Sequence, residues 1–530
     1  MTPEQWIAHD PDPKTAAELA ACSPDELAAR FARPLTFGTA GLRGPVRGGP
    51  DAMNVAVVSR ATWAVARVLA DRGLAGSLVV VGRDARHGSV VFATVTAEVL
   101  AAEGFSVLLL PGPVPTPVVA FAVRHTGAAA GIQITASHNP RTDNGYKVYF
   151  DGGIQIVSPT DRQIETAMAA APPADQIGRE PVEPAGSELV ARYVERAAGL
   201  RCAAGSVRIA LTPMHGVGGA VAVETLHRAG FGHVHTVGAQ FAPDPEFPTV
   251  AFPNPEEPGA TDALLALAAD THADVAIALD PDADRCAVGI PTVSGWRMLS
   301  GDETGWLLGD YILSHEQSRA SSGTAVVAST VVSSRMLSAI AAHYGAIHVE
   351  TLTGFKWLAR ADAKLPTGTL VYAYEEAIGH CVDPTAVRDK DGISAAVLVC
   401  DLVASLKEQG RSVCDRLDEL ALHYGVHEVA AVSRRVADVD EAVSLMRRLR
   451  AAPPKQLAGF AATITDITDA LIFAGGDYEV SARVVVRPSG TEPKLKCYLE
   501  IRCSVTDGLF LARQRAGALR DELVSAVQSW

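Results

Sequence analysis

The sequence predicts an α/β protein made of three successive α/β domains and a smaller C-terminal α+β domain. Three β-branched apolar runs, at residues 78–81, 207–211 and 324–328, each lead into small or polar residues and then a longer amphipathic stretch. This alternation is typical of parallel strands flanked by helices, with functional loops after the carboxyl ends of the strands. The runs start 129 and 117 residues apart, which suits domains of similar size rather than a solenoid repeat.

The pattern changes after Glu428. A charged helix is expected over 438–450, alternating strands over 481–486 and 496–502, and a last helix that ends at Trp530. These features predict the smaller α+β domain. The expected bounds are 1–198 for domain I, 199–315 for domain II, 316–427 for domain III and 428–530 for domain IV.

The composition excludes several classes of protein. The 530 residues include 46 Lys+Arg and 60 Asp+Glu, and this net charge of −14 argues against a nucleic-acid partner. Eight scattered cysteines without a C-x-x-C pair indicate neither a zinc ribbon nor a disulfide scaffold, so a reducing cytoplasm is the simplest location. The first residues lack the basic and apolar regions of a signal peptide, so export is not expected.

One uncharged stretch, residues 104–123, is about as long as a membrane span. Prolines at every second position from Pro111 to Pro117 oppose a continuous helix there. We expect a buried strand over 106–110 followed by an extended, proline-stiffened loop, and no membrane partner.

Ser137 and His138 follow a largely apolar run, within the sequence T-A-S-H-N-P. An exposed serine beside an imidazole can act as a nucleophile, although such a pair is more often a plain loop or cap. The absence of a G-x-S-x-G elbow argues against a serine hydrolase. Lys147, farther along, is a surface lysine or, if its pKa is lowered, an acid or base.

Asp280, Asp282 and Asp284 directly follow another apolar run. Residues two apart in an extended chain point the same way, so the three carboxylates are expected to converge. Their mutual repulsion favours a hard divalent cation between them, magnesium or calcium, over a solvated acidic turn. Arg285 and Pro291 stand where an EF-hand needs Gly and Glu, which excludes that motif.

Two other segments carry weaker signals. Residues 487–494, with the sequence R-P-S-G-T-E-P-K, offer a guanidinium, hydroxyls and backbone N–H groups that suit a phosphate, or they form a plain turn. Glu375 and Glu376 are adjacent carboxylates able to accept hydrogen bonds from sugar hydroxyls, but glutamate pairs are common.

Together with G-T-A-G-L-R-G at residues 38–44, these ordered motifs resemble the α-D-phosphohexomutases, the family that includes phosphoglucomutase and phosphomannomutase. The resemblance covers nearly the whole chain. It implies four domains around a central cleft, each contributing one loop to the active site. The expected fold is therefore three α/β domains with mixed sheets and a smaller C-terminal α+β domain.

The resemblance also implies roles for the motif residues. Ser137 would carry a phosphoryl group, and a phosphate oxygen would complete a magnesium site with the three aspartates. His138 and Lys147 would lie beside Ser137, and Lys147 would be the better acid or base of the two. The residues expected to neutralise phosphoryl charge or to bind the sugar phosphate are Arg43, Arg285, Thr353, Gly354, Lys356, Glu375, Glu376, Arg487, Ser489, Gly490, Thr491 and Lys494.

The activity implied is a phosphosugar mutase that interconverts hexose 1-phosphate and hexose 6-phosphate, of mannose or glucose. It would work through phosphoserine and a hexose 1,6-bisphosphate, which also serves as activator. Ala377 stands where many family members have Ser. The sequence E-E-A-I-G at residues 375–379, together with G-F-K-W at 354–357 and D-K-D-G at 389–392, resembles more closely the branch of the family that includes phosphopentomutase-like enzymes. Ribose and deoxyribose phosphates therefore stay open, as do a metal-dependent sugar phosphatase and a non-enzymatic sugar-phosphate-binding regulator.

Overall fold

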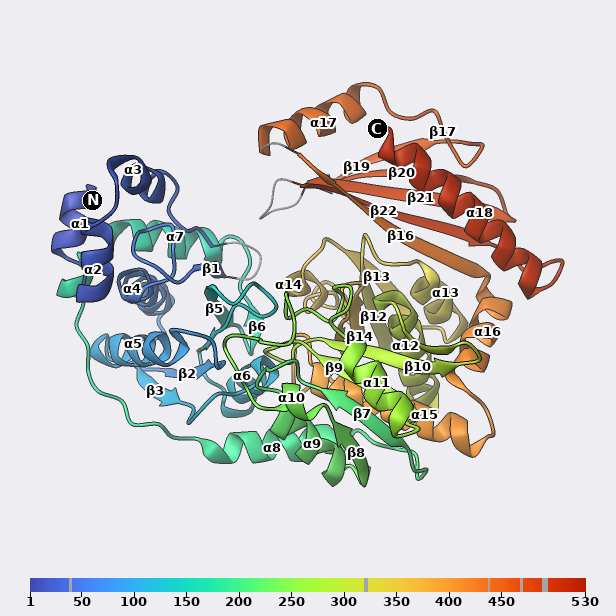
Figure 1. Ribbon diagram of the computed structural model, residues 1–530, viewed down its shortest axis with the longest axis horizontal. Helices are drawn as coiled ribbons and strands as arrows, with labels where there is room; N and C mark the ends of the chain where they lie inside the picture. Colours follow the sequence, from blue (N-terminus) through green and yellow to red (C-terminus); the bar gives the residue numbers. More distant parts are fainter. Residues whose placement is uncertain (38–40, 319–322, 437–438, 468–469, 489–493) are drawn as a thin grey trace.

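The computed structural model consists of three α/β units and a fourth unit with an antiparallel sheet, in chain order (Figure 1). It describes residues 1–37, 41–318, 323–436, 439–467, 470–488 and 494–530. In Figure 1 the first unit (blue) lies at the left, and the fourth (orange to red) lies above the third at the right. This architecture confirms the predicted fold class. Within the described residues, the helices are all too short or too polar to cross a membrane.

The first sheet is mixed. Its strand order is β1-β5-β4-β2-β3, with β6 also paired to β5; β2, β3 and β4 are parallel, whereas the pairings made by β5 are antiparallel. The strands are β1 (Leu42–Pro45), β2 (Leu78–Arg83), β3 (Ser106–Leu109), β4 (Ala130–Ile134), β5 (Asp143–Phe150) and β6 (Ile154–Gln155). The Ser137 motif is thus the connection between β4 and β5, and Lys147 pairs with Gln133 across the two strands.

The second and third sheets follow the same plan, with parallel central strands and an antiparallel edge. Their orders are β11-β10-β9-β7-β8 and β13-β12-β14-β15. The second sheet contains β7 (Arg208–Thr212), β8 (His233–Thr236), β9 (Val275–Leu279), β10 (Cys286–Thr292) and β11 (Gly295–Met298). The third contains β12 (Thr324–Thr330), β13 (Ile347–Thr351), β14 (Gly368–Glu375) and β15 (Gly379–Cys381).

The fourth sheet is antiparallel throughout its order, β16-β22-β21-β20-β19. Its strands are β16 (Val426–Arg435), β19 (Thr463–Ile467), β20 (Ala470–Gly476), β21 (Val480–Pro488) and β22 (Lys494–Cys503), and β17 (Gln456–Leu457) pairs separately with β18 (Phe460–Ala461). It packs against α17 (Val439–Ala451) and α18 (Leu509–Gln528), so the predicted helix, strands and final helix are confirmed.

Helices surround the first three sheets. The first unit has α1 (Pro3–Ala8), α2 (Pro13–Ala20), α3 (Pro24–Ala32), α4 (Val55–Asp71), α5 (Ser89–Ala102), α6 (Thr116–Thr126), α7 (Thr160–Ala170), the 3₁₀ turn η1 (Ala174–Gln176) and α8 (Ser187–Ala198). The second has α9 (Gly219–Arg228), α10 (Gly238–Phe241) and α11 (Asp262–Asp270). The third has α12 (Gly301–Ser318), α13 (Met336–His343), α14 (Phe355–Leu358), α15 (Gly392–Glu408) and α16 (Val413–Tyr424).

Helix α6 corrects one expectation. The extended loop predicted after β3 ends at Pro115, and a helix begins at Thr116 despite the prolines. Pro115 is the residue that precedes the helix, and Pro117 lies in its first turn, where no backbone N–H is needed for the helical ladder. The proline spacing therefore marked the start of a helix as well as a loop.

Helix α15 holds the units together. It is buried almost all round and packs against α8 and α9 as well as β9 and β10. Asp391 caps it by accepting hydrogen bonds from the N–H groups of Ile393 and Ser394, and it also accepts one from Tyr193 of α8. A Cβ at Gly392 would lie 2.3 Å from the carbonyl oxygen of Arg285. The glycine thus lets the helix start against the turn that carries the three aspartates.

The predicted domain bounds remain a prediction. The boundary expected between residues 315 and 316 falls inside α12, which packs against α13 and β14 of the third sheet.

Glu500 joins the fourth unit to the third. It is 5% exposed and accepts hydrogen bonds from Ser334 Oγ at 2.7 Å and from Arg335 N and Nε at 2.9 and 2.6 Å, while His427 Nδ1 lies 2.8 Å away. Burial opposes ionisation, but His427 and Arg335 lower the pKa of Glu500 well below its usual range. A lowered pKa means that this stabilisation exists above the unfolded-state pKa of about 4.3 and is lost as the pH falls further.

Glu500→Ala should lower the free energy of unfolding by roughly 3–5 kcal/mol, because it removes one partner from a buried ionic network. Differential scanning calorimetry at neutral pH would measure the loss. Asp466→Ala is the control, since Asp466 forms an exposed pair with Arg450 and its removal should leave the midpoint unchanged. Equal midpoints for the two variants would refute this role of Glu500.

Candidate active site

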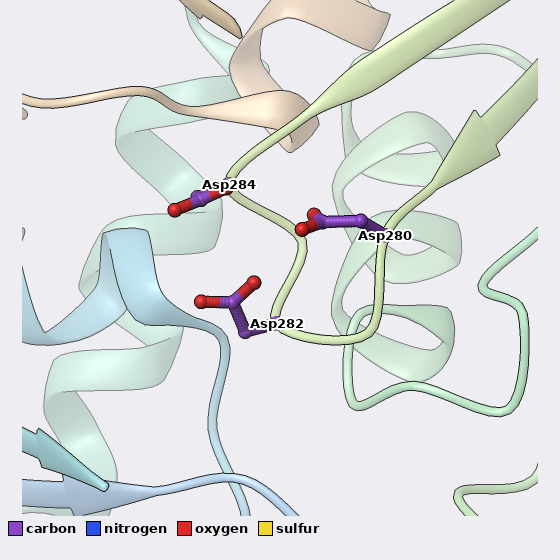
Figure 2. A group of neighbouring side chains, drawn as sticks. All are labelled: Asp280, Asp282 and Asp284. Carbon is purple, nitrogen blue, oxygen red and sulfur yellow. The ribbon is translucent and has the colours of Figure 1, made fainter. Parts of the chain in front are cut away.

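The three aspartates of the second unit lie in the turn between β9 and β10 (Figure 2). All are fully buried, and one oxygen of each lies within 4.8 Å of the others. Among the residues that the structure describes, Asp282 Oδ1 and Asp284 Oδ1 have no hydrogen-bond partner. Buried carboxylate oxygens left without donors fit a hard divalent cation, so the cluster has the chemistry of a magnesium site and is no solvated turn.

Lysines compensate part of this charge. Lys147 Nζ donates to Asp282 Oδ2 at 2.7 Å and to Asp284 Oδ2 at 2.8 Å, and Lys390 Nζ lies 3.4 Å from Asp284 Oδ2. Burial and the neighbouring carboxylates raise the pKa of Asp280 well above its usual range. For Asp282, burial is outweighed by Lys147, which lowers the pKa of that carboxyl.

The lowered pKa that the sequence analysis required of Lys147 is not found. Burial alone would lower it, but Asp282 and Asp284 raise the pKa of Lys147 above its usual value. The side chain is also buried, not on the surface. Lys147 is therefore a protonated ammonium, able to give a proton rather than to take one while both carboxylates face it.

Ser137 reaches the same cluster from the first unit. Its backbone has a φ of 52°, in the left-handed region, and Ala283 of the aspartate turn has a φ of 55°. Such strain is typical of functional loops. Ser137 Oγ donates to Asp280 Oδ2 at 2.7 Å and lies 3.2 Å from His138 Nδ1. Burial, with Arg285 and Arg43, lowers the pKa of His138 well below its usual value, so the imidazole is neutral.

Arg86 holds the Ser137 loop, a contact that the sequence analysis missed. Its buried guanidinium donates to four backbone carbonyl oxygens, those of Ser137 and Asn139 at 2.6 Å, Pro140 at 2.7 Å and Asp143 at 3.1 Å. Because the acceptors are main-chain atoms, no side-chain motif records the interaction. Arg86 follows β2 by three residues, and a basic residue after a parallel strand is the only signal the sequence offers.

Thr116 is a second residue that the sequence did not reveal. At the start of α6, its N–H donates to Asp282 O at 2.9 Å and its Oγ1 to Asp282 Oδ2 at 2.5 Å. The proline-stiffened loop before α6 thus positions a hydroxyl on the aspartate turn and joins the first unit to the second.

Two arginines flank the cluster. Arg43 of β1 donates to Asn139 Oδ1 at 3.3 Å, and burial lowers its pKa. Gly41 has a φ of +83°, and a Cβ there would lie 2.0 Å from Tyr146 O, which explains a glycine two residues before Arg43. Arg285 Nη1 lies 3.4 Å from Glu256 Oε2, and the backbones of Arg285 and Gly379 form a β-bridge. This bridge joins the aspartate turn to the loop that contains Glu375.

The predicted sugar-binding glutamates differ in their surroundings. Glu376 Oε2 accepts hydrogen bonds from Thr330 Oγ1 at 3.1 Å and Ser333 Oγ at 3.2 Å, within the third unit. Burial raises the pKa of Glu375, whereas Lys390 and Arg285 oppose this rise. Glu375 thus lies in the same charged region as the aspartates, and Glu376 already has partners.

The remaining predicted residues come from the third and fourth units. Arg487, near the end of β21, donates a hydrogen bond to Thr353 Oγ1, so the structure brings these two predicted residues into contact across the third and fourth units. Lys356 in α14 is buried, which lowers its pKa, and Gly354 before it has a φ of +103°, a conformation that favours glycine. Lys494 begins β22. Ser489, Gly490 and Thr491 lie outside the described residues.

Comparison with known proteins defines the class. Four family models match in order: the phosphoglucomutase/phosphomannomutase alpha/beta/alpha domains I, II and III over residues 34–174, 191–293 and 300–424, and the C-terminal domain over 434–507. The chain belongs to this phosphoglucomutase/phosphomannomutase family of phosphosugar mutases, which are isomerases.

Two relatives differ in the sugar that their names record. The chain is 42% identical to the "Probable phosphomannomutase" of Haemophilus influenzae, over 85% of this chain and 93% of that protein. It is 34% identical to the phosphopentomutase of Mus musculus, over 94% of this chain and 89% of that protein. A phosphoglucomutase/phosphomannomutase family protein of Burkholderia thailandensis shares the fold, with 20% identity, a TM-score of 0.71 and coverage of 92% and 96%.

Arg86→Lys should lower kcat for phosphosugar isomerisation about 100-fold and change KM less than about threefold. A lysine keeps the charge but cannot donate to four carbonyls, so the Ser137 loop loses its position, and a displacement of about 1 Å is enough for such a loss. Arg141→Lys is the matched control, because Arg141 lies in the same loop but pairs with the exposed Glu246. Steady-state kinetics that show an unchanged kcat for Arg86→Lys would exclude this positioning role.

Proposed function

We propose that this protein interconverts hexose 1-phosphates and hexose 6-phosphates, of mannose or glucose, through a phosphorylated Ser137 and a 1,6-bisphosphate intermediate. The observation that carries the proposal is the 2.7 Å contact between Ser137 Oγ and Asp280, which brings a nucleophilic oxygen from one unit onto the carboxylate cluster of another. Phosphoryl transfer depends mainly on such positioning and on electrostatic stabilisation.

In the proposed reaction, a free hydroxyl of the sugar phosphate attacks the phosphorus of phosphoserine, and the bond from phosphorus to Ser137 Oγ breaks. The bisphosphate then reverses its orientation without leaving the site, and its other phosphoryl group is transferred to Ser137 Oγ. We assign proton transfer to Lys147, whose ammonium lies against the cluster and supplies the proton that the departing Ser137 oxygen takes up. The neutral amine left on Lys147 then accepts the proton that the attacking sugar hydroxyl releases, so the lysine is protonated again when the transfer is complete.

Asp280, Asp282 and Asp284 would hold Mg²⁺, which when bound supplies charge neutralisation at the transferring phosphoryl group. Arg43 and Arg285 would add positive charge on either side of it. Lys356, Arg487 and Lys494 would bind the phosphate that does not react, together with Ser489, Gly490 and Thr491. Thr353, Gly354 and Glu375 would contact the sugar, and Glu376 would support that loop through Thr330 and Ser333.

Pentose phosphates are a second candidate substrate class. Ala377 removes the hydroxyl that many family members place in the sugar loop, here residues 375–379, and phosphopentomutases are among the relatives of this chain. Loss of one polar partner changes discrimination between sugars strongly. Values of kcat/KM for mannose 1-phosphate and ribose 1-phosphate, with a trace of the matching bisphosphate, decide between the two classes.

Intact-mass spectrometry of the purified protein should show a single phosphate, which should be absent from Ser137→Ala, and the mutase activity of that variant should fall at least about 1,000-fold. Ser187→Ala, which removes an exposed serine at the start of α8, should keep both. Full activity in Ser137→Ala would contradict the mechanism. If the protein without substitutions releases inorganic phosphate from the sugar phosphate and forms no isomeric product, the result would instead favour a phosphatase.

A further inference from the structure

A cavity of about 710 Å³ lies where the second, third and fourth units meet. All three units contribute polar side chains to its wall, among them Glu256, Glu257, Glu376, Lys496 and Tyr498. Ala377 also lines it, so the cavity borders the loop that is proposed to bind the sugar.

Glu256 connects this cavity to the charged centre. Its Oε2 lies 3.4 Å from Arg285 Nη1, at the long end of hydrogen-bond distances, and 38% of its side chain is exposed. Arg285 in turn follows Asp284 in the aspartate turn and forms a backbone bridge with Gly379 of the sugar loop. Glu256 therefore stands where the aspartate turn, the sugar loop and the cavity come together.

The sugar loop alone offers few hydrogen-bond acceptors. Glu376 already accepts from Thr330 and Ser333, and Ala377 has no hydroxyl. Glu375 is then the remaining carboxylate of this loop. A sugar presents several hydroxyl donors, and a site that discriminates between sugars must pair them individually. A second acceptor from another element would pair one more of these hydroxyls, and Glu256 is the carboxylate from the second unit that lines the cavity beside this loop and lies next to Arg285.

We propose that Glu256 is a specificity-determining residue, whose carboxylate accepts a hydrogen bond from a ring hydroxyl of the sugar bound beside Arg285 and Glu375. The inference rests on the proposed mutase function. Arg285 uses one oxygen of Glu256, Oε2, and within the described residues Oε1 has no hydrogen-bond partner. That oxygen can pair with a hydroxyl while Arg285 faces the phosphoryl group. Substrates that differ in the position or presence of this hydroxyl are then distinguished.

The test compares Glu256→Ala with Glu257→Ala, a matched change in the next residue, which lines the same cavity without a contact to Arg285. Values of kcat/KM are measured for mannose, glucose and ribose 1-phosphates with bisphosphate activator. Glu256→Ala should lower the value for the best substrate about 10- to 100-fold, as expected for a lost hydrogen bond to a charged group, and that for the poorest less than about threefold. Glu257→Ala should keep the ratios within about twofold.

An equal loss on all three sugars would overturn the proposal, because it would mean that Glu256 only holds Arg285 in place. Unchanged values would overturn it as well. Intact mass should still show one phosphate on the Glu256→Ala protein, which establishes that the Ser137 site is formed. If the unmodified protein isomerises none of the three sugar phosphates, the proposed function itself fails; altered kinetics of the variant alone concern only Glu256.

Discussion

The structure depends on the burial of three carboxylates in one turn. Asp280, Asp282 and Asp284 are fully removed from solvent, and such a concentration of negative charge is unfavourable unless cations and hydrogen-bond donors surround it. The donors come from separate parts of the chain: Ser137, Lys147 and Thr116 from the first unit and Lys390 from the third. The carboxylates of the turn therefore receive these hydrogen bonds and this positive charge only when the units pack together. Helix α15, which begins against the same turn at Gly392, provides the apolar part of that packing.

The same constraint explains how an acidic protein can handle anionic sugar phosphates. The net charge of −14 describes the whole chain, whereas Arg43, Lys147, Arg285 and Lys390 gather around the aspartate turn. Positive charge held at a buried site acts through a low dielectric and needs little reorganisation during phosphoryl transfer. Exposed carboxylates such as Glu246 and Asp466 contribute to the net negative charge without lying in this centre, and they keep the surface hydrated.

The fold class and the aspartate cluster could be predicted from the sequence, because both depend on residues that lie close together in the chain. Alternating aspartates after an apolar strand predicted the cluster, and βα alternation predicted the sheets. Arg86, Thr116 and Glu256 carry no comparable signal, since each acts on a residue 20 or more positions away through contacts that only the tertiary fold creates. Lys147 shows a related limit: its position in the site was expected, but its pKa is set by Asp282 and Asp284, about 135 residues away. The prolines before α6 were interpreted only as a loop, because the same residue type stiffens loops and starts helices.

The central claim is that Ser137 and the three aspartates form one metal-dependent phosphoryl-transfer centre. Anomalous diffraction from crystals grown with Mn²⁺ in place of Mg²⁺ tests it most directly, because it locates the ion without reference to activity. The account predicts one strong peak among Asp280, Asp282 and Asp284, with metal–oxygen distances close to the roughly 2.0–2.1 Å of magnesium sites and a phosphate oxygen on Ser137 as a further ligand. A metal peak elsewhere, or a fully occupied phosphoserine with no ion among the aspartates, would contradict it.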